Sequence, residues 1–100
     1  MRQWTTDRLT FGIPYTVSEL RDGYVTFSQG GITVLEKNIF DSDVELSDGL
    51  IEIPLTQEQT GALPEGMIEM QIRLALMNGD APASDKMQTF VDGVLKGGVI

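Results

Sequence analysis

The sequence predicts an all-β domain, an immunoglobulin-like β-sandwich of about seven short antiparallel strands with one helical turn. Apolar and polar residues alternate with a period of two along most of the chain, the pattern of strands buried on one face. Glycine-rich turns separate these runs, and 100 residues suit one domain (residues 1–100) with a single core. A small β-barrel gives the same pattern and stays open as the alternative.

The first strand is predicted near the start of the chain. Leu9, Phe11 and Ile13 alternate with small or polar residues. Pro14 then interrupts the run, because proline has no backbone N–H to continue a ladder. Since prolines in sheets are found mainly at edges, we expect this strand to lie at an edge.

A hairpin is expected next. Residues 24–28 alternate apolar and polar side chains, as a strand with one buried face does. Gly30-Gly31 follows, and two adjacent glycines accept the positive φ angles of a tight hairpin turn. The return strand is predicted over residues 32–36.

A polar stretch, residues 38–43, interrupts the strand pattern in the middle of the chain. Ile39 and Phe40 are its only large apolar residues, so we expect both to anchor it to the core. A short strand is predicted at residues 44–46, and the turn residues 47–49 close it.

A strand followed by a helical turn is expected from residue 50 onward. The strand is predicted over residues 50–55, with its buried face formed by Ile51, Ile53 and Leu55. Thr56 and Gln59 then have the spacing of a capping box, in which each side chain bonds the other residue's backbone. Gly61 and Pro64 end the helical turn.

The last two strands include the most regular run of the sequence. Residues 68–76 alternate strictly, which predicts one dry face and one wet face. Asn78-Gly79 is a hairpin signal because both residues accept positive φ. The return strand is expected within residues 83–95, with the alternating residues Met87, Thr89 and Val91.

The composition limits the chemistry. The chain contains no histidine and no cysteine. Ser-His-Asp and Cys-His arrangements, thiolate zinc sites and disulfides are therefore excluded. Histidine is also the usual general base near neutral pH and the commonest neutral metal ligand. We expect a binding or structural protein rather than an enzyme, without a cofactor and without catalytic or metal-ligating residues.

The charge indicates which partners to expect. Fifteen acidic and seven basic residues give a formal net charge of −8. A surface of this sign repels phosphate backbones, so nucleic acid is not an expected partner. No apolar run approaches the ~20 residues of a membrane-spanning helix, and the first residues lack the apolar stretch of a secretion signal. No membrane partner is expected.

Two groups of carboxylates have a possible chemical role and a plainer one. The densest acidic group partly fits a calcium loop, but Leu46 stands where an EF-hand requires glycine. The members of this group are expected to lie in a solvated acidic loop; they are Asp41, Asp43, Glu45 and Asp48. Glu52 and Glu69 could pair as acid and base, but both alternate with apolar residues and fit the wet face of a sheet. Arg73 is expected to pair with Glu52 or Asp85.

The aromatic and methionine side chains also allow two interpretations. Trp4, Tyr15 and Tyr24 could form a stacking platform for sugars, but Trp4 is expected to cap the core beside the first strand. The methionines could form an adaptable surface, and filling gaps between the two sheets is the expected role. They are Met67, Met70, Met77 and Met87.

The second half of the chain carries several short motifs in a fixed order. They are the strand and turn Ile53-Pro54-Leu55-Thr56-Gln57-Glu58-Gln59-Thr60-Gly61, then Gly66, Gln71-Ile72-Arg73, Asn78-Gly79, Ser84-Asp85 and the closing Val94–Ile100. This order resembles the N-terminal domain of upper baseplate proteins and related tail components of phages and prophages of Gram-positive bacteria. The resemblance is closer over about residues 50–100 than over the first half.

The resemblance implies a β-sandwich and a virion component that is made in the host cytoplasm. The implied function is that of a tail or baseplate-type assembly module acting through contacts with other phage structural proteins and with copies of itself, as a homo-oligomer. These contacts are expected at the first strand, through Leu9 and Phe11, and at the segment around Val99-Ile100. A small carbohydrate-binding or host-surface-binding module is the alternative. Trp4, Tyr15 and Tyr24 are the residues expected to touch a carbohydrate or a host surface.

Overall fold

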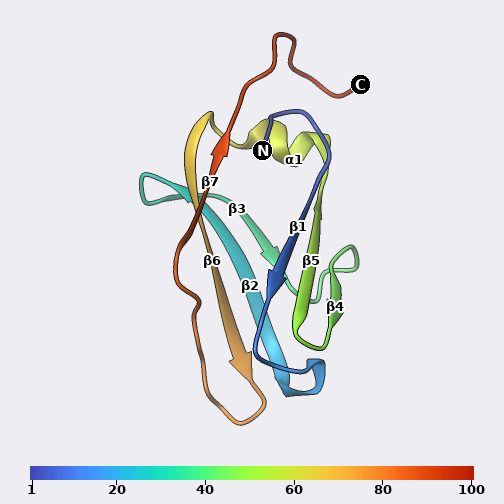
Figure 1. The fold of residues 1–100 in the computed structure, drawn as a ribbon, viewed down its shortest axis with the longest axis vertical. Coiled ribbons are helices and arrows are strands. Elements are labelled where there is room, and N and C mark those ends of the chain that lie inside the picture. The colour runs from blue at the N-terminus through green and yellow to red at the C-terminus, as the bar shows by residue number, and fades with distance from the viewer.

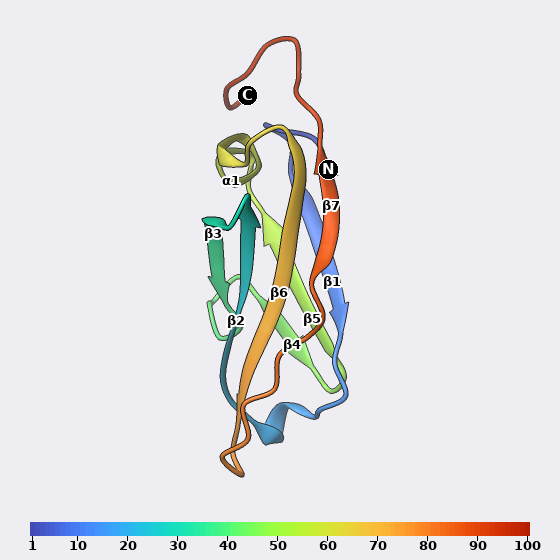
Figure 2. The same cartoon turned by 90° about the vertical axis from the view of Figure 1, so that its left-hand side faces the viewer.

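The computed structural model describes all of residues 1–100 and consists of two antiparallel sheets packed face to face (Figures 1 and 2). The three-stranded sheet has the order β1 (Asp7–Gly12), β5 (Leu50–Leu55), β4 (Glu45–Ser47). The four-stranded sheet has the order β3 (Ile32–Asn38), β2 (Leu20–Gln29), β6 (Gly66–Leu76), β7 (Met87–Val91). A short helix, α1 (Gln57–Ala62), and a 3₁₀ turn, Val17–Glu19, complete the fold. The predicted all-β sandwich of seven strands with one helical turn is confirmed.

The strands are divided into sheets of four and three, as in the immunoglobulin constant-type sandwich. The strand order is different. In that sandwich the first two strands share a sheet and the third lies in the other one. Here β2 pairs with both β3 and β6, whereas β1 pairs with β5. The hairpin β2–β3 therefore stays within one sheet, and β1 forms an edge of the other.

The core lies between the two sheets and is built from the alternating residues. One face of β5 and one face of β6 supply most of it, because successive side chains on a strand point to opposite sides. The buried apolar residues are Phe11, Leu20, Val25, Phe27, Ile39, Ile51, Ile53, Leu55, Leu63, Ile68, Met70, Ile72, Leu74, Leu76 and Val91. The predicted dry faces of residues 50–55 and 68–76 are thus confirmed.

Only one of the two expected anchors of residues 38–43 reaches the core. Ile39 is fully buried, but Phe40 next to it is 50% exposed, so the prediction for Phe40 is wrong. Both residues lie in the turn that follows β3, which is closed by the bond from Asp41 N–H to Asn38 O, and in this turn only Ile39 reaches the core. The methionines divide in the same way: Met70 is buried and Met87 half-buried, whereas Met67 and Met77 are exposed.

The two glycine turns behave differently. Gly30 (φ 58°) and Gly31 (φ 80°) both take positive φ, as the predicted tight turn between β2 and β3 requires. In the second turn only Gly79 does so (φ 95°), and regular pairing resumes only at Met87. Pro82 lies in between and has no N–H for a ladder, so the chain returns beside β6 as an irregular segment.

Helix α1 closes one end of the sandwich (Figure 1). Its capping box is present as predicted: Gln59 N–H donates to Thr56 Oγ1 at 3.2 Å, and Thr56 N–H donates to Gln59 Oε1 at 2.9 Å. Thr60 is fully buried and holds the N-terminal segment through Thr5, whose N–H donates to Thr60 Oγ1 at 3.1 Å. No helix of the structure combines the length and apolar character needed to cross a membrane.

The first residues connect the two sheets. Residues 1–3 run parallel to the end of β7, where Gln3 N–H donates to Asp92 O and Asp92 N–H donates to Met1 O, both at 2.8 Å. The chain then turns at Trp4, the only residue other than glycine with positive φ (61°), and enters β1 in the other sheet. The N-terminal segment therefore covers the end of β7 but leaves β1 itself at an edge.

Candidate functional site

The outer edge of β1 is the part of the fold that is best placed to contact another protein. β1 pairs with β5 on one side, and no strand pairs with its other side. Ile13 N–H donates to Gly49 O at 3.0 Å, which fixes the phase of the ladder between the two strands. Hydrogen-bonded and non-bonded positions alternate in an antiparallel pair, so Thr10 and Gly12 direct their N–H and C=O groups away from β5.

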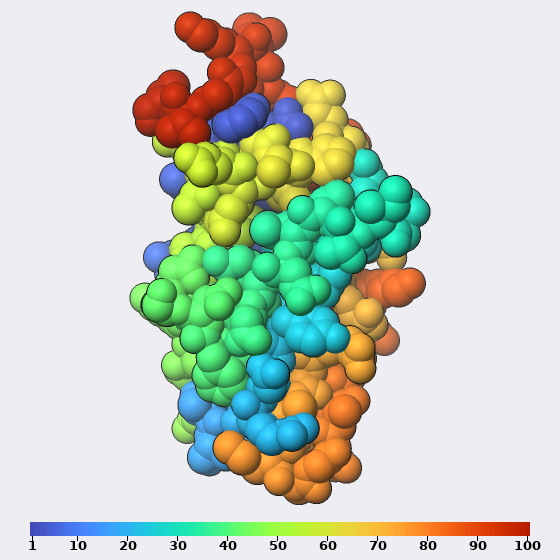
Figure 3. Space-filling model, turned by 180° about the vertical axis from the view of Figure 1, so that it is seen from behind, coloured from blue at the N-terminus to red at the C-terminus, as the bar shows by residue number.

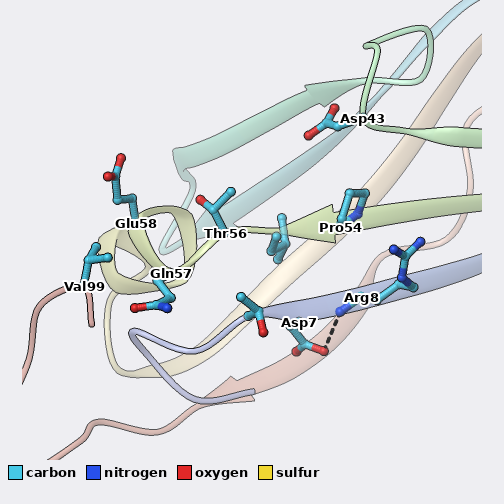
Figure 4. A pocket seen from close by; sticks show the side chains of 10 residues that line it. Asp7, Arg8, Asp43, Pro54, Thr56, Gln57, Glu58 and Val99 are labelled. Atoms are coloured by element: carbon cyan, nitrogen blue, oxygen red, sulfur yellow. Dashed lines mark hydrogen bonds between the residues drawn. The ribbon is translucent and has the colours of Figure 1, made fainter.

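Pro54 in β5 agrees with this phase. It lies opposite Arg8 and has no N–H to donate. Arg8 N–H points away from β5 and donates instead to the carboxylate of Asp7 at 2.8 Å (Figure 4). The free backbone groups of β1 are therefore those of Thr10 and Gly12, toward the far end of the strand.

The other edges of the two sheets are covered or shortened. The N-terminal segment bonds to Phe90 and Asp92 and so occupies the outer side of β7 over its last residues. β4 has only three residues, and short edge strands offer little to a partner. On the outer side of β7, the backbone groups of Gln88 at the start of the strand stay unpaired.

The edge of β3 is protected by a charge. Lys37 lies opposite Val25, whose side chain is fully buried, so Lys37 also points toward the interior and is only 6% exposed. Its ammonium group is paired with Asp43 at 2.7 Å. An inward-pointing charge of this kind is a known protection of edge strands. In addition, Asp41 accepts the N–H of Asn38, and a bulge interrupts the β2–β3 ladder. In Figure 3, which views the molecule from behind, residues 32–47 (teal to green) lie across the middle of the visible surface.

An apolar cleft adjoins the free end of β1. It has a volume of about 210 Å³ and lies between the end of β1 and the irregular segment that returns beside β6. Its lining residues are Gly12, Ile13, Pro14, Tyr15, Ile72, Leu74, Pro82, Ala83 and Ser84. Because regular pairing of β7 starts only at Met87, the core is open here between the two sheets. The cleft has room for an apolar side chain of a partner.

The residues predicted for interaction are distributed over three regions. Leu9 is half-buried on the inward face of β1, at the margin of the core. Phe11 is 7% exposed and belongs to the core, so its ring is not a surface feature. Tyr15 lines the apolar cleft. Leu9 and Tyr15 therefore flank the open edge, and Phe11 supports it from within.

Trp4 and Tyr24 lie away from this edge. Trp4 packs against α1 and the C-terminal segment so closely that a Cβ atom on Gly61 would lie 2.4 Å from its ring, and one on Gly97 would lie 2.8 Å from Nε1. Tyr24 lies on the outer face of β2, where Arg73 donates to its hydroxyl at 3.0 Å. The three rings of Trp4, Tyr15 and Tyr24 do not share one face, so the stacking platform considered for sugars is not assembled.

The interactions of Arg73 and Glu52 differ from those predicted. Arg73 contacts Tyr24, with its guanidinium carbon 5.8 Å from the ring centroid, and forms no ion pair with Glu52 or Asp85. Glu52 pairs instead with Arg8 at 3.3 Å, because β5 lies beside β1 in the other sheet. For the same reason Glu52 and Glu69 belong to different sheets and do not form a carboxylate pair.

The largest cleft of the molecule is polar and open. It has a volume of about 890 Å³ and lies between the starts of β1 and α1, the end of β5 and Val99 of the C-terminal segment (Figure 4). Asp7, Asp43 and Glu58 line it together with Arg8. Asp43 is paired with Lys37, and Asp7 accepts the N–H of Arg8. Two of its three carboxylates, Asp7 and Asp43, are therefore already engaged by other groups of the chain.

The predicted acidic group is dispersed among separate partners. Asp41 accepts the N–H of Asn38, Asp48 accepts the N–H of Val17, and Asp43 pairs with Lys37. Glu45 lies 3.8 Å from Arg8 on the outside of β4. The structure contains no cluster of three or more carboxylates that could hold a metal ion. These side chains act as turn caps and ion-pair partners.

Two carboxyl groups have pKa values below their ordinary value of 3.8. The hydrogen bond from the side chain of Asn38 lowers the pKa of Asp22, assisted by the N–H of Gly23. The hydrogen bond from Lys37 lowers the pKa of Asp43, and its positive charge adds to this effect. Sequence patterns do not identify Lys37 as buried, because a lysine in a strand ordinarily indicates the wet face.

The C-terminal segment lies over α1 (Figure 3). Gln57 holds it through its side-chain amide, which accepts the N–H of Ile100 at 2.8 Å and donates to its C=O at 3.3 Å. Leu95, Val99 and Ile100 remain largely exposed.

Comparison of the sequence with protein-family models and with curated proteins finds no match.

Proposed function

We propose that this chain is a structural protein of a phage or prophage particle, an assembly module of the tail or baseplate type. It binds other structural proteins of the particle and carries out no catalysis. The resemblance of residues 50–100 to baseplate domains supports the phage assignment. The geometry of the β1 edge supports the mode of action.

The observation that carries the proposal is the uncovered edge of β1 beside an apolar cleft. Thr10 and Gly12 turn their backbone groups outward. A partner strand that pairs with them would continue the three-stranded sheet, and such main-chain hydrogen bonds give affinity in β-strand addition. The cleft of about 210 Å³ beside Ile13 would take a side chain of that strand and so provide specificity.

The rest of the sandwich suits a structural role. The molecule is flat and elongated, with principal extents of 48 × 27 × 16 Å. One continuous core joins both sheets, and the capped helix and N-terminal segment close one end. A body of this kind keeps its shape when a neighbour binds to its edge. In an assembly, the edge strand then sets the direction of the next subunit.

Mass spectrometry of purified particles tests this function. Particles are collected after prophage induction of the strain that encodes the chain, and the abundance of the polypeptide is measured relative to the major tail proteins. The proposal predicts a fixed ratio across preparations, with an abundant host protein as the control for contamination. Presence in the lysate together with absence from intact particles would contradict it.

A further inference from the structure

We propose that the partner of the β1 edge is the β1 edge of a second copy of this chain, in an antiparallel pair around a two-fold axis at Phe11. This inference rests on the proposed function and deepens it by naming the partner and the register. Each β1 would extend the three-stranded sheet of the other copy, so that one continuous sheet crosses the interface.

The backbone argument follows from the phase of the ladder. Thr10 and Gly12 carry the outward N–H and C=O groups of β1. With the axis at Phe11, Thr10 of one copy lies opposite Gly12 of the other, and both are in the bonding phase. The two symmetry-related pairs then satisfy these groups in both copies. Arg8 is not needed in this ladder, because its N–H already donates to Asp7.

The side chains fit the same register. Leu9 of one copy lies opposite Ile13 of the other, and both are half-buried apolar residues on the inward face. Ile13 lines the apolar cleft, so Leu9 of the second copy would sit over that cleft and cover it. On the outward face, Gly12 lies opposite Thr10 and leaves space for its side chain. An axis at Thr10 would instead place Asp7 opposite Ile13, which sets a carboxylate against the apolar cleft.

The charge distribution favours self-association at this strand. The chain carries a net charge of −8, so most surfaces of two copies repel each other. Residues 9–13, Leu-Thr-Phe-Gly-Ile, contain no charged residue. The β3 edge carries the inward-pointing charge of Lys37, and the β7 edge is already occupied over its last residues. The β1 edge therefore allows two identical strands to approach without opposing like charges.

Disulfide cross-linking tests the register, and the absence of native cysteines gives a clean background. Thr10→Cys and Gly12→Cys are prepared separately; at Gly12 the nearest atom to an added Cβ is 4.0 Å away. Bonded antiparallel pairs have Cα atoms about 5.5 Å apart, which suits a disulfide. Under mild oxidation, intact mass spectrometry should find the mixed Thr10→Cys/Gly12→Cys dimer at least about tenfold above its level in a denatured mixture of the two variants. Preferential dimers of Thr10→Cys alone, or no enrichment of the mixed dimer, would overturn the proposed register.

A proline pair tests the edge independently. Thr10→Pro removes an outward N–H of β1, and Gln88→Pro removes the corresponding outward N–H of β7 as a matched control. Both variants are checked for folding by circular dichroism before sedimentation. The wild type and Gln88→Pro should form dimers in the same concentration range, and Thr10→Pro should remain monomeric. Dimers of folded Thr10→Pro, or a wild type that stays monomeric at millimolar concentration, would contradict the proposal.

The outcomes separate this inference from the proposed function. A particle protein that shows neither the cross-link nor the dimer retains its structural role, and its β1 partner is then another protein. A chain that forms the mixed cross-link but is absent from particles retains the β1 pairing and loses the phage assignment.

Discussion

Trp4 fixes one end of the sandwich through contacts with two glycines. Its ring fills the space beside Gly61 of α1 and Gly97 of the C-terminal segment, where a Cβ atom would lie within 3 Å of it. Trp4 also takes positive φ at the point where the chain passes from one sheet to the other. The sequence predicts that Trp4 caps the core beside the first strand, whereas its ring lies against Gly61 and Gly97, outside the group of side chains packed on the core. These contacts are distant along the chain and have no local signal.

Gly61→Ala should therefore destabilise the protein, by about 1–3 kcal/mol in the free energy of unfolding. In an unobstructed helix the same change stabilises the protein by roughly 0.5–1 kcal/mol. A loss of stability would therefore indicate that the added Cβ is obstructed. The loss should be smaller when it is measured in a Trp4→Ala background, because the ring that obstructs the Cβ is gone. Gly12→Ala is the control, since its Cβ has space. Equal effects of Gly61→Ala in both backgrounds would show that the ring is not the cause.

The pair Lys37–Asp43 links a buried ammonium group to a partly exposed carboxylate. Asp43→Asn should reduce the free energy of unfolding at neutral pH by about 1–3 kcal/mol, because Lys37 stays buried without its charged partner. Asp85→Asn is the matched control, since the carboxylate of Asp85 forms no ion pair in the structure. Denaturant unfolding of both variants measures the difference.

The same pair makes the stability of the protein depend on pH. The folded pKa of Asp43 lies below its ordinary value of 3.8, so the unfolded chain takes up the proton first as the pH falls. The stabilisation is complete well above pH 3.8 and is lost as the pH falls below 3.8 and through the folded pKa. The difference between wild type and Asp43→Asn should therefore shrink in that range. A difference that is constant from pH 7 to about pH 3 would contradict this account.

At the scale of elements, the local signals in the sequence predict local structure well. The alternation in residues 50–55 and 68–76 identifies both strands and their buried faces, because each strand has water on one side only. The return strand expected within residues 83–95 is found at Met87–Val91, the residues whose alternation predicts it. The Asn78-Gly79 signal applies to the turn alone and does not predict the irregular segment that follows it, where Pro82 has no N–H for regular pairing. The alternation of apolar and polar residues does not tell which strands pair with each other, so the pairing of β1 with β5 is not predicted.

The capping box of α1 is a local signal with a measurable energy. Thr56→Ala removes the acceptor of the Gln59 N–H and should lower the free energy of unfolding by about 1 kcal/mol. Thr33→Ala on the exposed side of β3 is the control, because the Thr33 side chain makes no hydrogen bond. Thermal unfolding of both variants gives the comparison. A loss for Thr56→Ala no larger than that for Thr33→Ala would mean that the cap does not stabilise α1 in solution.

At the scale of the whole molecule, the candidate site arises from what the fold leaves uncovered. The sequence indicates that the first strand lies at an edge, through Pro14, and this is confirmed. It does not indicate that the N-terminal segment covers β7, or that Lys37 points inward at β3. Both features depend on the three-dimensional arrangement, and both leave β1 as the edge without protection. Composition and alternation therefore predict the architecture, and the site requires the structure.

The net charge of −8 on each copy predicts how self-association responds to salt. Raising the ionic strength from about 0.01 M to 0.15 M shortens the screening length from about 30 Å to about 8 Å and weakens the repulsion between copies. Dimerisation of the wild type should therefore become tighter, whereas Thr10→Pro should stay monomeric at every salt concentration. Sedimentation equilibrium measures both. Weaker association at higher salt would mean that ion pairs, rather than the uncharged residues 9–13, hold the copies together.

Hydrogen exchange at the amides of β1 tests the central claim most directly. In dilute solution, NMR should find slow exchange for Leu9 and Phe11, which bond to β5, and fast exchange for Thr10 and Gly12. At concentrations where the copies associate, the amides of Thr10 and Gly12 should become protected while those of β3 and β7 stay unchanged. If Thr10 and Gly12 exchange as fast in the associated protein as in the dilute one, the β1 edge is not the contact, and the account of this protein as an edge-pairing module is wrong.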